Sequence, residues 1–94
     1  MGKFAVAICD DLSLKLFKVE AKDELDAVLK VFKTIYHKDL VKEMSSYNYT
    51  KALGFNPEKP EETLTWEVLM DYIQLEYPHY LIAVRRCEGG VDIS

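Results

Sequence analysis

Residues 3–21, KFAVAICDDLSLKLFKVEA, decide the fold of this chain because they predict two β-strands joined by a tight turn. From Lys3 to Cys9, large apolar residues alternate with small ones, which is the two-residue period of a strand. Beyond Lys3 this segment contains no charged side chain, so we expect it at the centre of a sheet with both faces covered or nearly so. Asp10 and Asp11 follow it, and aspartate favours turns.

The second strand is predicted over residues 12–21, and its apolar residues change phase partway along. Leucine occupies alternate positions up to Leu16, and the apolar series then continues from Phe17 to Ala21 in the opposite phase. A slip of one residue moves a side chain to the other face of a sheet. We therefore expect a β-bulge or a twist near Leu16 and Phe17.

Two helices are predicted next. The first begins in an acidic turn at Asp23 and repeats apolar residues at three- and four-residue spacing as far as Tyr36. The second covers about residues 39–53, although the serines and aromatic residues of its second half have poor helix propensity. Glycine often follows the last residue of a helix, and Gly54 stands at that place.

A loop over residues 56–62 separates these helices from a third, which we expect from Thr65 or Trp66 to Tyr77. Threonine is a good helix cap, and Pro78 prevents the helix from continuing. Residues 79–87 are rich in aromatic and β-branched side chains and predict a third strand.

These elements predict an α+β domain with the order ββαααβ, in which three helices pack on a small, mainly antiparallel three-stranded sheet. The 94 residues suit one domain, and 49% of them are hydrophobic, enough for a core of its own. We expect that domain to span residues 1–94, with a short flexible tail over about 89–94.

Charge and composition narrow the classes of function. The chain carries 12 basic and 16 acidic residues, and a net charge of −4 argues against general electrostatic binding to nucleic acid. No apolar run is long enough to span a membrane. No secretory signal is evident, so we expect a cytoplasmic protein in which Cys9 and Cys87 are reduced.

Motifs of catalysis and of metal binding are missing from the sequence. The four glycines form no phosphate-binding loop, and no nucleophile elbow is present. Cysteine and histidine never occur at the close spacing of a compact zinc site. We expect no enzyme, no metal and no cofactor, although distant residues can assemble a site and a small enzyme stays open as a third interpretation.

The third helix carries apolar residues around more of its circumference than one sheet contact requires. Either its second side is buried within the monomer, or it forms a surface for a homodimer or another partner. Tryptophan and tyrosine are favoured at binding hot spots. For a binding role, the preferred contacts are Trp66, Met70, Tyr72, Tyr77, Tyr47 and Tyr49.

Basic residues of the strands offer an alternative. Adjacent residues of a strand point to opposite faces, so one of Arg85 and Arg86 is expected to be partly covered and to need a carboxylate partner. The structural alternatives are an ion pair or simple exposure where the strand ends. The other possibility is an anion contact made by Arg85, Arg86, Lys15 and Lys18. Together with Tyr80 these side chains would suit a nucleic-acid or nucleotide-binding module that uses the sheet face.

The favoured interpretation is a small acidic binding or regulatory protein that acts through contacts with another protein or as a homodimer. Inhibitors of host machinery encoded by phages or mobile elements fit this profile. The nucleic-acid-binding module is the alternative.

Overall fold

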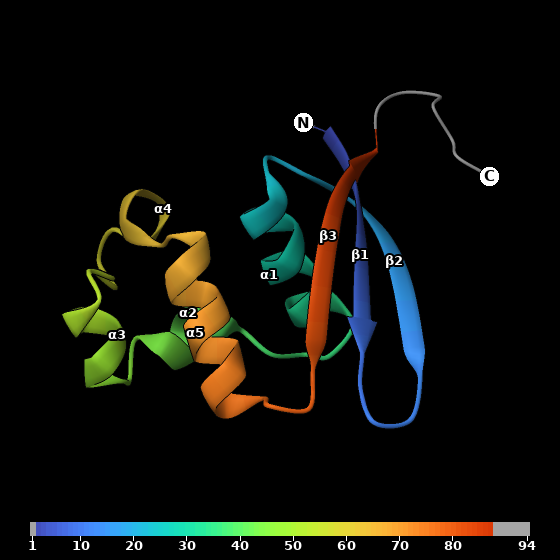
Figure 1. Cartoon of the computed structure of the whole chain (residues 1–94). Coiled ribbons are helices and arrows are strands. Elements are labelled where there is room, and N and C mark those ends of the chain that lie inside the picture. Colours follow the sequence, from blue (N-terminus) through green and yellow to red (C-terminus); the bar gives the residue numbers. More distant parts are fainter. Residues whose placement is uncertain (1, 88–94) are drawn as a thin grey trace.

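A computed structural model of the chain describes residues 2–87 (Figure 1). Its elements are β1 Gly2–Cys9, β2 Leu14–Ala21, α1 Glu24–Thr34, α2 Leu40–Met44, α3 Asn48–Ala52, α4 Pro60–Thr63, α5 Trp66–Glu76 and β3 Leu81–Cys87. The predicted α+β class is confirmed. The expected tail over residues 89–94 lies outside the described residues.

The three strands form one antiparallel sheet in the order β2-β1-β3. β1 is therefore the central strand, as its sequence predicts. Its large side chains, Phe4, Val6 and Ile8, are at most 1% exposed and face the helices. All helices lie on that side of the sheet (Figure 1), and α1 packs directly against the three strands.

The expectation that both faces of the sheet are covered is wrong for the part of the chain that the structure describes. The second face carries only small residues in the central strand, namely Ala5, Ala7 and Cys9, and no described helix packs on it. Small side chains lose little by exposure, which explains why the uninterrupted apolar sequence of β1 does not require a second layer.

The predicted bulge near Leu16 and Phe17 is also absent. Pairing between β1 and β2 runs without a break from Gly2 opposite Ala21 to Cys9 opposite Leu14. The change of phase has another cause: β2 presents apolar side chains to both faces. Phe17 points into the core, whereas Leu16 points away from the helices.

The helical region differs from the prediction in two respects, and the first is that the segment over residues 39–53 forms two short helices, α2 and α3. The hydroxyl of Thr50 is fully buried and lies 2.7 Å from the carbonyl oxygen of Met44 and 2.8 Å from that of Tyr47. A side chain that bonds to backbone carbonyls competes with the helical pattern. A further short helix, α4, forms in the predicted loop and begins at Pro60.

Local end signals predicted from the sequence are confirmed. The Asp10 carboxylate accepts hydrogen bonds from the amides of Leu12 and Ser13, both at 2.9 Å, and these bonds lower the pKa of Asp10. Thr65 caps α5 by accepting from the Val68 amide at 3.2 Å. Gly54 follows α3 with a φ of 107°, a conformation that glycine adopts without strain.

Candidate functional site

The face of the sheet that points away from the helices is the first candidate, and we call it the open face. Alternation along the paired strands places twelve residues on it. They are Lys3, Ala5, Ala7 and Cys9 of β1, Leu14, Leu16, Lys18 and Glu20 of β2, and Leu81, Ala83, Arg85 and Cys87 of β3.

The end of the open face nearest the β1–β2 turn is apolar. Two rows of neighbours cross the sheet there: Leu16, Ala7 and Ala83 form one, and Leu14, Cys9 and Leu81 form the other. The side chains of Leu14, Leu16 and Leu81 are 72%, 65% and 71% exposed. Large apolar residues gathered on one exposed face mark interaction surfaces more often than isolated ones do.

The opposite end of the open face is charged. Lys18 and Arg85 flank Ala5, and the next row places Lys3 between Glu20 and Cys87. The face thus carries three cations and one carboxylate, in a chain whose net charge is −4. The sheet side is basic and the rest of the molecule is acidic.

The four basic residues predicted to contact an anion do not share a face. Lys18 and Arg85 lie on the open face, whereas Lys15 and Arg86 lie on the helix side. The Lys15 Nζ atom stands 5.9 Å from the centre of the Tyr36 ring, and the Arg86 Cζ atom 5.5 Å from that of Phe4.

Tyr80 is not on the open face either. Its ring stacks on that of Tyr77, with centroids 5.9 Å apart, and contacts Phe32 and Tyr36. No aromatic side chain is among the residues of the open face, so the described sheet offers bases no platform for stacking.

Most of both apolar sides of α5 is covered within the monomer. Val68 and Leu69 are at most 4% exposed, and Tyr72 is 1% exposed. The first of the two possibilities that the sequence left open therefore describes this helix. The large apolar residues that α5 leaves exposed are Leu75, at 63%, and Trp66, at 36%.

The structure brings four of the six predicted contact residues together, because the rings of Tyr47, Tyr49, Tyr72 and Tyr77 form one cluster with neighbouring centroids 5.5–6.5 Å apart. Tyr72 is buried and unavailable to a partner in this fold. Met70, Tyr77, Tyr47 and Tyr49 are half-buried and pack against the core. Of the six residues, only Trp66 is exposed.

A cluster of tyrosines and glutamates joins α2 to α5. The Oε1 atom of Glu43 accepts hydrogen bonds from the hydroxyls of Tyr72, at 2.6 Å, and Tyr77, at 2.7 Å, and Tyr47 donates to Glu76 at 3.0 Å. Burial and the bonds to Glu43 raise the pKa of Tyr72 and Tyr77 well above the ordinary tyrosine value. The small pocket between these groups, about 320 Å³, is therefore bordered by side chains that bond to one another.

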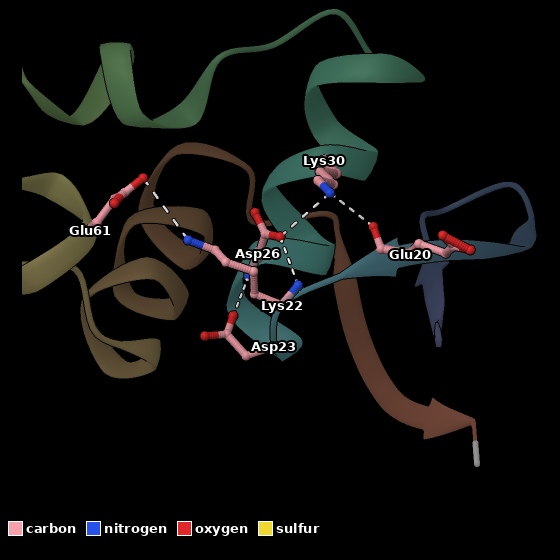
Figure 2. Close-up of polar contacts among 6 residues, drawn as sticks. All are labelled: Glu20, Lys22, Asp23, Asp26, Lys30 and Glu61. Atoms are coloured by element: carbon pink, nitrogen blue, oxygen red, sulfur yellow. Dashed lines mark hydrogen bonds and ion pairs between the residues drawn. The ribbon is translucent and has the colours of Figure 1, made fainter. Parts of the chain in front are cut away.

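A larger groove of about 560 Å³ lies between α1, α2 and α4. Figure 2 shows its charged rim: Lys22 lies 4.0 Å from Glu61, and Lys30 lies 3.6 Å from Asp26 and donates to the carbonyl oxygen of Glu20 at 2.9 Å. The floor is apolar, formed by Leu25, Leu29, Leu40, Val41 and Leu64. Because most of its rim charges are matched with each other, with Lys33 the exception among its lysines, this groove indicates no particular ligand.

The exposed leucines of the open face are what sequence analysis missed, although it named the sheet face, with Lys18 and Arg85, for the alternative function. The signal of these leucines was present in the change of apolar phase along β2, which we interpreted as a β-bulge or a twist. An unbroken strand with apolar residues in both phases predicts instead that both faces are apolar, and one of them can remain exposed.

Within the described residues, no group of three or more potential metal-ligating side chains is close enough to hold an ion. No described helix is long and apolar enough to cross a bilayer.

The Glu43 cluster generates a prediction for stability. Replacing Glu43 with Leu leaves the Tyr72 and Tyr77 hydroxyls without their acceptor, and we expect the free energy of unfolding to fall by about 2 kcal/mol. Chemical denaturation followed by circular dichroism measures the change. Gln74→Leu, at an exposed position of α5, is the control and is expected within about 0.5 kcal/mol of the original chain. Equal effects of the two substitutions would contradict the role of Glu43.

The same cluster predicts loss of stability in alkali. The folded state raises the pKa of Tyr72 and Tyr77, so their contribution is complete below the ordinary tyrosine pKa of about 10 and declines above it, where only the unfolded state ionises. We expect the free energy of unfolding to decrease above about pH 10, and the tyrosinate absorbance of these residues to rise only as helical circular dichroism is lost. Ionisation of all six tyrosines in an intact fold would contradict this.

No family model, curated protein or solved structure matches this chain.

Proposed function

We propose that this protein is a binding module and that the open face is its docking surface for another protein, one with an apolar centre and an acidic rim. One observation carries the proposal: Leu14, Leu16 and Leu81 are each at least 65% exposed on adjacent rows of one sheet face. Burying leucine side chains of this size is worth about 1.5–3 kcal/mol each.

Charge supports the choice of an acidic partner. Lys3, Lys18 and Arg85 lie beside the apolar rows, with Glu20 the one carboxylate of the face. An acidic rim would attract these cations during approach and fix the orientation of the complex. A second copy packed face to face would place the basic groups either against one another or against the apolar rows, so this surface does not favour a second copy.

The size of the open face supports a regulatory contact rather than a permanent one. Three strands about 4.8 Å apart and seven or eight residues long cover roughly 400 Å² in plan. Stable complexes bury about 800 Å² on each partner, and smaller areas are typical of transient encounters.

The cytoplasm remains the expected compartment. Cys9 and Cys87 lie at opposite ends of the open face, since Cys9 pairs with Leu81 and Cys87 comes six positions after Leu81. That distance, about 20 Å along an extended strand, is far beyond the reach of a disulfide. Because these two thiols cannot reach each other, the structure is compatible with a protein in which both cysteines stay reduced.

Selection from a library of displayed random peptides tests the docking surface. We expect the bound peptides to combine leucine or aromatic residues with aspartate or glutamate. Leu16→Thr, which retains strand propensity, and Lys18→Glu should each weaken binding by about tenfold or more, since one leucine contact exceeds 1.4 kcal/mol. Fluorescence anisotropy with a selected peptide measures the affinity.

Leu75→Gln is the matched control because Leu75 is also exposed, at 63%, but lies on α5. It should leave the affinity unchanged. Selected peptides that lose affinity for the Leu75 variant and retain it for the Leu16 variant would place docking on the helices. Basic peptides would overturn the stated chemistry of the partner.

A further inference from the structure

The two edges of the sheet are protected to different degrees. An edge strand leaves backbone amides and carbonyls free to pair with another chain, and proteins protect such strands with charged side chains, lysine above all, or with covering elements. β2 and β3 are the edges here, because β1 lies between them.

The β2 edge is protected. Lys15 and Lys18 are both exposed along it. Lys30 reaches over from α1 and donates through its Nζ atom to the backbone carbonyl of Glu20, as Figure 2 shows. An incoming strand would have to displace this lysine and pass the other two.

The β3 edge is less protected over its first four residues, because its two charges, Arg85 and Arg86, lie at one end of the strand. Leu81, Ile82, Ala83 and Val84 follow each other without a charge, and neither lysine nor proline occurs in the strand. Between Leu81 and Arg85 the backbone of β3 pairs with β1. Ile82 and Val84 point toward the helices and yet are only half-buried, so the core is open along this edge.

We propose that β3 pairs antiparallel with β3 of a second copy of this chain, joining two three-stranded sheets into one sheet of six strands. The seven residues Leu81–Cys87 have Val84 at their centre. A two-fold axis at Val84 pairs all seven, with Ala83 opposite Arg85 of the second copy and Leu81 opposite Cys87 of the second copy.

The number of paired residues and the positions of the charges together select this register. With Val84 on the axis, Arg85 faces Ala83 and Arg86 faces Ile82, so no arginine has an arginine directly opposite. Moving the axis by one residue toward the carboxyl end places Arg85 opposite itself, and like charges in directly opposed positions are destabilising. Some registers would pair a residue of the open face with a residue of the helix side. These registers would place Ile82 and Val84 of the second copy on the open side of the joined sheet, and the two-residue side-chain period excludes them.

Pairing at this edge leaves the open face free and makes it larger. The apolar row of Leu16, Ala7 and Ala83 would continue into the row of Arg85, Ala5 and Lys18 of the second copy. The inference does not depend on the proposed docking function, because edge pairing uses the backbone of β3 and docking uses side chains of the face.

Sedimentation equilibrium over a range of protein concentrations tests the pairing. We expect a monomer–dimer equilibrium. Ala83→Lys places a cation opposite Arg85 of the second copy and should raise the dimer dissociation constant at least tenfold, whereas Ala83→Glu should lower it. Leu16→Lys is the control, since it adds the same charge to the same face at the other edge, and it should leave the constant unchanged.

Three results would overturn the inference: a monomer at every concentration, equal dissociation constants for the two Ala83 variants, or an equal loss of dimer in the Leu16 variant. The last would indicate that the copies meet face to face. Loss of peptide docking with the dimer intact would count against the proposed function alone.

A cysteine variant tests the register. In a Cys9→Ser background, Leu81→Cys places a thiol opposite Cys87 of the second copy, and directly opposed residues of antiparallel strands have Cα atoms about 4.5–5.5 Å apart, within disulfide range. Mild oxidation should give a covalent dimer on a non-reducing gel. Leu14→Cys in the same background, on the β2 edge, is the control and should remain largely monomeric. Equal cross-linking of both variants would exclude this register.

Discussion

The structure depends on a division of side chains in β1, where the large residues all point to one face and the small ones to the other. Phe4, Val6 and Ile8 are almost fully buried under the helices. Because β1 is hydrogen-bonded on both sides, the division extends to its neighbours: Val6 lies opposite Phe17 of β2 and Val84 of β3. The helices must gather where these side chains point. The opposite face carries the alanines of β1 and the side chains that β2 and β3 place beside them.

Much of this fold could be predicted because its signals are local. The turn at Asp10, the cap at Thr65 and the glycine after α3 each depend on residues that lie within a few positions of one another in the sequence. The strand period of β1 and β3 and the helical period of α1 are also local, and together they were enough for the α+β class and the position of the central strand.

The features that could not be predicted depend on residues far apart in sequence. The break between α2 and α3 follows from burial of Thr50, which only the packed state creates. Tyr72 has the residue type of a binding contact but lies in the core, where it bonds to Glu43, 29 positions earlier. The leucines of β2 can be recognised as exposed only when it is known that the helices lie on one side. Periodicity identifies the faces of a strand and does not say which of them the rest of the chain will cover.

The position of β1 between two partners also determines when the sheet can be completed. Its contact with β2 is available as soon as the first hairpin exists, but Lys3 meets Cys87 only after the whole helical region lies between them. Contacts of such long sequence separation form late, because closing the intervening loop has a large entropic cost. During synthesis, at about 5–20 residues per second, the hairpin therefore waits for several seconds with one side of its first strand unpaired. In that interval, early docking of α1 is what prevents the large apolar residues of β1 from contacting other nascent chains.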